Sequence, residues 1–586
     1  MPDVDDTPAP TPAPDAIDRI GRLFHTVFPI LIAIGATAST AYWKLANALI
    51  SPFNYDGDAV QHGFWAQRSW GATLLEHDVF AQFYASDAMA PPGYRWLMLL
   101  LGSLGDIQLM GELAMIGLIG ITAVVLFLLG WRASGSLWGG AVLVAFLMWF
   151  AIQNERPFGS IILQRHFALV LLAAGLYGLV SRRVWIVGLA ILGSSLFYPI
   201  TLAVLGMTAF VHEGIRLAVD RKLPRGWWIA LLLGLAAVGV LASRDIPDEY
   251  GPRVTAEQAR TMPIFQDGGR SQYWVANERD FLYHHHRTGL GHDPAELCKA
   301  ALVLLPFVLL AWRSSSPAAW IMLVVSVSLW GIAHLVPFHL YLPNRHVRVP
   351  LPLAYATLFA SVVPAAVSRV DGVIRRWLAF NPSPIAWRIA TAVVVPIALS
   401  IYAGEQFRPD VIERRKEVRR VLKRPPEPPR VVEEYLRNTP PDFLVAGHPE
   451  EIQHISLTTG RPTLVNRETL VPYYLGFYES VARPRAQAAL DAYYASDWPT
   501  FDRLLAELGV DAFYVVHHPP QPRRKPLEEP LATMTEAAIA RLGERVPVTV
   551  DSPAARILAH DTHRHITLVR VGGARSAAVP SAPPAD

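Results

Sequence analysis

The sequence predicts a polytopic α-helical membrane protein with about 11 transmembrane helices and a soluble α/β domain at its C-terminal end. Of its 586 residues, 52% are hydrophobic and 17% are charged, whereas soluble domains usually carry about 25% charged residues. Long apolar runs recur between residues 27 and 404, and short strand-like runs follow between residues 431 and 575. A chain with so few charges needs lipid to cover its apolar surface, which excludes a soluble enzyme.

The predicted spans are apolar runs that approach the roughly 20 residues a helix needs to cross the hydrocarbon layer. They are Val27–Ile50, Leu109–Gly130, Ser136–Ala151, Phe167–Val180, Val184–Tyr198, Ile200–Arg216, Trp227–Leu241, Ala300–Trp312, Ala318–Pro337, Val349–Val367 and Ile389–Tyr402. A further run, Tyr94–Leu104, is interpreted as interfacial or re-entrant, because an odd number of crossings is needed between the loops on either side of it.

Orientation follows from lysine and arginine, which concentrate in cytoplasmic loops. The densest basic loops are Arg216–Arg225 and Arg369–Arg388. Placing both inside leaves loops 51–91 and 243–297 outside, together with everything after the last span. The N-terminus is then cytoplasmic. The abundance of Ala, Arg and Pro favours a high-GC bacterium, whose inner membrane would place the C-terminal domain in the periplasm.

The predicted domain organisation follows from changes in composition along the chain. Residues 1–26 are predicted to be a disordered cytoplasmic tail, since they lack the basic start of a cleaved signal peptide. The transmembrane domain spans 27–404, a proline-rich linker spans 405–430, the external α/β domain spans 431–575, and 576–586 form a second disordered tail. Within the α/β domain, the predicted elements are the strands Phe443–Ala446, Ala512–Val516 and His565–Val571, and a helix over Phe501–Leu508 that ends at Gly509.

The first external loop carries the strongest candidate for chemistry. Asp56 and Asp58, followed by Gln61 and His62, stand where the first span meets water. Carboxylates there suit a general base toward an acceptor hydroxyl, or ligands for a divalent cation. The alternative is a solvated turn at the end of a helix, with Gly57 supplying the flexibility.

Arginines at the outer ends of two other spans give a second candidate site, Tyr341–Arg348, and a separate, weaker candidate pair, Arg165 and His166. Arg345 and Arg348 flank His346 in a short external loop, and Arg165 precedes His166 at the start of another span. Guanidinium groups make paired, charge-assisted hydrogen bonds to phosphate, and these positions run against the positive-inside trend. The alternative is ordinary snorkelling of long side chains toward the membrane surface.

The loop 243–297 is predicted to contact an acceptor. Tyr273 and Trp274 are suited to stacking on sugar rings, next to an amide at Gln272. The run His284–His286 suggests zinc, but adjacent residues of regular structure point apart and no further ligands at fixed spacing accompany it, so we do not predict a zinc site.

The arrangement resembles the C-type (GT-C) glycosyltransferases, polytopic enzymes that use polyprenyl-phosphate-linked sugars. The likeness rests on a first span, a long external loop with an acidic motif, and Pro91-Pro92-Gly93-Tyr94 opening an apolar stretch. It implies a GT-C-like fold, a polyprenyl-phosphate-sugar donor and a glycan, lipid or protein acceptor. Asp58, and less favourably Asp56, matches the family's catalytic acidic position. The Trp-Trp-Asp motif of the oligosaccharyltransferase branch is missing, so transfer to asparagine is not expected.

Two other functions remain compatible with the sequence: a transporter or flippase of lipid-linked glycans, and a catalytically silent scaffold in envelope-polysaccharide assembly. Transporters often show internal repeats and polar groups at the membrane midplane, whereas the conspicuous charges here lie at the outer boundary. The formal net charge of +3 gives no indication of a nucleic-acid partner. The single cysteine, Cys298, excludes an internal disulfide framework.

Overall fold

The computed structural model describes residues 16–378, 430–548 and 556–572, apart from short gaps at 51–56, 70–71, 74, 76, 155–156, 160, 223–224, 292, 341 and 518–526. In this part of the chain, six helices are long and apolar enough to cross a membrane, and four shorter apolar helices accompany them. The prediction of a polytopic helical membrane protein is therefore confirmed. The predicted span Ile389–Tyr402 lies outside the described residues.

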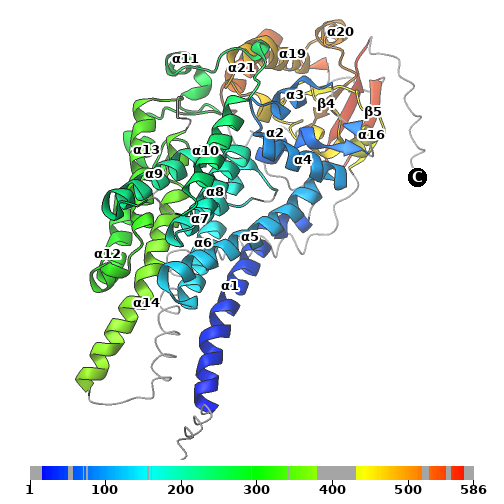
Figure 1. Ribbon diagram of the computed structural model, residues 1–586. Helices are drawn as coiled ribbons and strands as arrows, with labels where there is room; N and C mark the ends of the chain where they lie inside the picture. The colour runs from blue at the N-terminus through cyan, green and yellow to red at the C-terminus, as the bar shows by residue number, and fades with distance from the viewer. Residues whose placement is uncertain are drawn as a thin grey trace, which may run out of the picture.

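The apolar helices form one bundle, with α1 and α14 extending furthest from the C-terminal unit (Figure 1). They are α1 (Ala16–Ile50), α5 (Ile107–Ser134), α6 (Leu137–Gln153), α7 (Phe167–Val180), α8 (Val184–Phe197), α9 (Ile200–Asp220), α10 (Trp227–Ala242), α12 (Pro294–Ala311), α13 (Pro317–Leu335) and α14 (Pro350–Leu378). The close crossing of α5 and α6 depends on small residues, because a Cβ on Gly130 would lie 2.4 Å from the carbonyl oxygen of Gly139.

Helix α1 corrects the predicted N-terminal boundary. It begins at Ala16, within the stretch 1–26 that the sequence analysis assigns to a disordered tail. Residues 16–26 contain no proline, so nothing in the backbone chemistry stops the membrane helix from continuing beyond the apolar run. Hydropathy marks where a helix enters lipid, and the helix itself extends past that point.

Short elements lie in the segments 51–104 and 243–297. They are α2 (Gly57–His62), α3 (Val79–Ala85), α4 (Pro92–Leu104), α11 (Ala256–Thr261) and the two-residue strands β1 (Arg68–Ser69) and β2 (Ala72–Thr73). Helix α4 has proline at its first position, where the missing N–H costs nothing. It buries Tyr94 and Met98 while exposing Trp96, Leu100 and Leu104 at a helical spacing of four. An apolar exposed face on a helix this short fits the predicted interfacial segment.

The C-terminal unit is a four-stranded mixed sheet in the order β3-β4-β6-β5, with β3 parallel to β4 and the other pairs antiparallel. The strands are β3 (Val445–Gly447), β4 (Ala512–Val516), β5 (Ile557–Asp561) and β6 (Ile566–Arg570). The helices around them are α16 (Val431–Arg437), α17 (Ile455–Thr459), α18 (Leu475–Phe477), α19 (Arg483–Tyr493), α20 (Trp498–Ala506) and α21 (Leu531–Leu542). The three predicted strands and the predicted helix are confirmed, whereas β5 and the other helices were not predicted.

Strand β4 shows why this unit folds as two apolar layers. Ala512 and Tyr514 pack into one buried cluster, while Phe513 and Val515 pack into another. Successive side chains of a strand point to opposite faces, so both faces of the sheet are covered. This explains why β4 reads as an uninterrupted apolar run.

The C-terminal unit is joined to the loops 51–91 and 243–297 by aromatic rings and backbone hydrogen bonds. Phe83 of α3 stacks on Phe477 with ring centroids 4.1 Å apart, and the edge of Tyr250 meets Phe83 at 4.9 Å. The amide of Val254 donates to the carbonyl of Tyr473 over 3.1 Å. The short helices α2 and α3 accordingly lie among C-terminal elements in Figure 1.

Asp78 gives this junction a testable pH dependence. Its carboxylate caps α3 by accepting from the amide of Ala81 at 2.7 Å. Burial raises the pKa of Asp78 to about 6, against about 3.9 in an unfolded chain. The folded state therefore holds the proton more tightly, and folding stability falls as pH rises from about 4 to about 6, by on the order of 2–3 kcal/mol. Thermal unfolding midpoints across this range should show that fall.

The matched comparison for Asp78 is the Asp78→Asn variant, since asparagine also caps helices but does not titrate. Its midpoint should lose this component of the pH dependence, whereas Asp248→Asn, at an exposed position, should keep it. An unchanged pH profile in Asp78→Asn would show that Asp78 is not the group responsible.

Candidate functional site

Asp58 lies in the first turn of α2, where the first external loop meets the C-terminal unit. Gly57 allows the close approach, because a Cβ there would lie 3.3 Å from Oε1 of Glu468. Gln61, one turn later, is buried and donates from Nε2 to the hydroxyl of Tyr84 over 3.2 Å. Helix α2 is therefore held on both sides, and Asp58 has a fixed place. Asp56 lies outside the described residues.

Arg165 meets Asp58 from a segment 107 residues away, donating from Nη1 to Oδ2. It sits in the 3-10 turn Gln164–His166 just before α7. The neighbouring His166 is fully buried, and its Nδ1 accepts from the amide of Leu163 at 3.0 Å. His166 therefore shapes the turn that presents Arg165.

Arg345 and Arg348 come from the segment that connects α13 to α14. The 3-10 turn Pro343–His346 is tied to the loop 243–297, since Asn344 Nδ2 donates to the carbonyl of Gly289 over 2.5 Å. His346 is buried, and its Nε2 lies 2.9 Å from the carbonyl of Leu340. As with His166, this histidine holds the turn while the adjacent arginine side chain reaches into the site.

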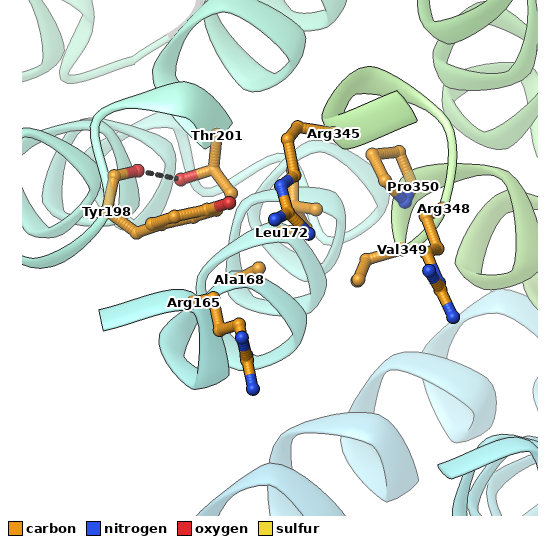
Figure 2. A pocket seen from close by; sticks show the side chains of 9 residues that line it. All are labelled: Arg165, Ala168, Leu172, Tyr198, Thr201, Arg345, Arg348, Val349 and Pro350. Atoms are coloured by element: carbon orange, nitrogen blue, oxygen red, sulfur yellow. Dashed lines mark hydrogen bonds between the residues drawn. The ribbon is translucent and has the colours of Figure 1, made fainter. Parts of the chain in front are cut away.

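The three arginines line one small, partly open pocket. In Figure 2, Arg345 points toward the ring of Tyr198, whereas the side chains of Arg165, from the turn before α7, and Arg348, from the segment before α14, extend away from that ring. The full lining is Arg165, Ala168, Leu172, Tyr198, Thr201, Arg345, Arg348, Val349 and Pro350. The sequence predicts Tyr198-Pro199 as a turn between spans. It is one, and Tyr198 also forms a wall of the pocket.

The charges around Asp58 set its protonation state. Partial burial alone would raise the pKa of Asp58, but the guanidinium of Arg165, through its charge and its hydrogen bond, holds that pKa well below its usual range. Burial lowers the pKa of His62 to about 4. At neutral pH the site therefore combines an ionised Asp58 and permanent arginine charges with a neutral His62.

A second carboxylate near Asp58, that of Glu468, is not predicted by the sequence. Glu468, from the turn Arg467–Thr469 of the C-terminal unit, forms an ion pair with Arg270 of the loop 243–297 and has a side chain 7% exposed. Burial and the negative charge of Asp58 both contribute to raising the pKa of Glu468, against the opposing effect of Arg270. Arg467-Glu468 looks like an ordinary surface charge pair in sequence, so no local signal marks it.

Tyr273 and Trp274 lie in a separate aromatic cluster with Phe265 and Phe338. Tyr273 is 1% exposed, so its ring has no free face for a sugar in this conformation, while Trp274 is partly exposed. Their role toward an acceptor stays a prediction.

The predicted divalent cation near Asp56 and Asp58 stays a prediction, since Asp56 lies outside the described residues. Among them no group of three His, Cys, Asp or Glu side chains is placed to hold a metal ion. The two carboxylates beside α2 are engaged with arginines, Asp58 with Arg165 and Glu468 with Arg270. These ion pairs do not fit a cation site, and no step below involves a metal.

Known proteins give a distant structural likeness. The chain is similar to an oligosaccharyltransferase of Archaeoglobus fulgidus in its apo form (TM-score 0.48), tethered to an acceptor peptide containing the NVT sequon (0.43), and, as AglB, in complex with an inhibitory peptide and a dolichol-phosphate (0.39). Each match has 12% identity and covers 84% of this chain and 70% of the other. No family model matches the chain. No curated protein matches it either. A likeness at this level carries no statement about the reaction.

Proposed function

We propose that this protein is a membrane glycosyltransferase that moves a sugar from a polyprenyl-phosphate-linked donor to a hydroxyl of a glycan, lipid or protein. The observation that carries the proposal is the pocket that Arg165, Arg345 and Arg348 line beside Asp58. In the orientation that the basic loops favour, this pocket faces the non-cytoplasmic side of the membrane, where the donor's phosphate would lie.

The lining of the pocket suits the two halves of such a donor. Guanidinium groups bind phosphate through paired, charge-assisted hydrogen bonds and keep their charge when partly buried. The rest of the wall is largely apolar, with Ala168 and Leu172 from α7 and Val349 beside the start of α14. A charged end next to an apolar wall at the mouth of a helix bundle fits a phosphate attached to a lipid chain.

The reaction assigns Asp58 the role of general base. The acceptor oxygen attacks the anomeric carbon of the sugar and forms the new C–O bond, while its proton passes to the Asp58 carboxylate. The bond between the anomeric carbon and the phosphate oxygen breaks, and its electron pair stays on the phosphate. The arginines offset the negative charge that develops there in the transition state.

Mass spectrometry of co-purifying lipids tests the donor site. Polyprenyl phosphate, or its sugar-loaded form, should accompany the wild-type protein and be lost from the Arg345→Ala/Arg348→Ala variant, because two of the three pocket guanidiniums are gone. Arg279→Ala is the matched control, since Arg279 is an external-loop arginine 66% exposed and paired with Asp293. Its lipid content should equal that of the wild type.

The outcomes separate the proposal from its rivals. Polyprenyl lipid retained equally by all three proteins would place the phosphate site outside this pocket. If polyprenyl lipid is missing from all three proteins, the result would contradict the transferase proposal and favour the scaffold function. The mass of the bound lipid would in addition identify the sugar.

A further inference from the structure

We infer that Arg165 has two alternative partners, the carboxylate of Asp58 and the phosphate of the donor, so that donor binding converts Asp58 into a base. The inference rests on the proposed function and adds an order of events to it. It starts from a conflict within the site, because the group that should accept a proton is bonded to a cation.

The conflict is visible in the contacts of Arg165. Its Nη1 donates to Oδ2 of Asp58, yet the same side chain lines the pocket with Arg345 and Arg348. The two ends of this pair differ in their surroundings: the Arg165 side chain is 19% exposed and that of Asp58 is 36% exposed. One side chain, Arg165, therefore both contacts the Asp58 carboxylate and lines the pocket proposed for the phosphate.

Pairing with Arg165 makes Asp58 a poor base. A general base works best when its proton affinity matches the operating pH, and the neighbouring cations hold the pKa of Asp58 well below its usual range despite burial. As long as Arg165 stays on Asp58, the carboxylate has little tendency to take a proton from a hydroxyl.

A phosphate in the pocket would change this balance. It presents several oxygens to the fork of Arg165 and is placed between three guanidinium groups, so it competes well against a single carboxylate. Transfer of Arg165 to the phosphate removes the hydrogen bond that holds Asp58 ionised. The negative charge of the phosphate then raises the proton affinity of Asp58 further. The base is formed only when the donor is in place, which makes donor binding the first step.

The competition has a consequence that binding alone can measure. Removing the charge of Asp58 should tighten phosphate binding, because Arg165 no longer has to leave a carboxylate. We expect the affinity of the full-length Asp58→Asn protein for farnesyl phosphate, a sugar-free lipid phosphate, to rise roughly tenfold over the wild type. Isothermal titration calorimetry in detergent gives this affinity without any turnover.

Simple repulsion between Asp58 and the phosphate would also tighten binding in Asp58→Asn, so a double-mutant cycle is needed. In an Arg165→Gln background the gain from Asp58→Asn should largely disappear if Arg165 mediates it. Glu468→Gln removes a nearby carboxylate that is bonded to Arg270 and not to Arg165, and it should give a smaller gain. Arg165→Lys keeps the charge without the fork and should bind more weakly than the wild type.

Each outcome bears on a different claim. Farnesyl phosphate that binds the wild type but no tighter to Asp58→Asn would overturn the partner exchange and leave the donor site standing. If Asp58→Asn raises the affinity for farnesyl phosphate equally in the Arg165→Gln background, repulsion between Asp58 and the phosphate explains the increase. That result would also overturn the partner exchange of Arg165. If farnesyl phosphate binds none of these proteins, the donor site itself is wrong, and with it both proposals.

Discussion

Replacing Asp58 with asparagine is expected to lower the rate of sugar transfer by roughly 10²- to 10⁴-fold, the contribution typical of a positioned general base. Asparagine has nearly the same shape and can still accept a hydrogen bond from Arg165, but it cannot take up the proton of the acceptor hydroxyl. The donor recovered with the wild-type protein is the substrate for the assay, and turnover is followed by transfer of its sugar.

The matched control for the loss of turnover in Asp58→Asn is the Asp248→Asn variant. Asp248 is an exposed aspartate of the loop 243–297, so it carries the same change without touching the pocket, and its turnover should match the wild type. Asp58→Asn should also keep the unfolding temperature of the wild type to within a few degrees. Full activity in Asp58→Asn would remove Asp58 from the mechanism and leave Asp56 as the next candidate.

The largest expected effect on stability comes from Phe83→Ala. The ring of Phe83 is 0% exposed and lies between Phe477 of the C-terminal unit and Tyr250 of the loop 243–297. Truncating a buried phenylalanine costs about 3–5 kcal/mol, because apolar contacts are lost and a cavity remains. Chemical denaturation of the detergent-solubilised protein should show that loss.

Phe210→Ala provides the matched control for Phe83→Ala, since Phe210 lies on α9 and is 75% exposed. Its unfolding free energy should change little in detergent, where its ring remains in an apolar surrounding. A Phe83→Ala protein as stable as the wild type would mean that the aromatic cluster does not hold the C-terminal unit to the external loops. Because α2 also packs at this junction, Phe83→Ala should impair donor turnover as well.

The sequence anticipates those elements whose signal is local. A membrane helix such as α5 is marked by its own hydropathy, since each residue must favour lipid by itself. Strand β4 is marked in the same way, because both of its faces are buried. Strand β5 has exposed and buried positions in irregular order, Ile557 being exposed and Asp561 buried, so its sequence carries no strand pattern. The edge position in the sheet, next to β6, gives it its structure.

The sequence predicts Asp58, Arg165 and Arg345 as site residues one by one. Burying a charge at the end of a membrane span costs free energy, so such charges indicate function. Their shared pocket was not recognisable. Nor was Glu468, whose importance comes entirely from contact with Gly57 and Arg270. His166 and His346 are predicted to bind substrate beside the arginines. One ring nitrogen of each contacts the local backbone and holds its turn, and a role in binding stays a prediction.

The amino-acid sequence alone predicts an integral membrane protein, the approximate positions of its helices, and the charged residues at the ends of its spans. These properties are sums over neighbouring residues, and transfer between water and lipid acts on each residue where it stands. Only the tertiary structure decided that Arg165 reaches Asp58 and that Arg345 and Arg348 face the same space. An ion pair between residues 107 apart depends on how α7 packs against the first external loop, and no stretch of sequence contains that packing.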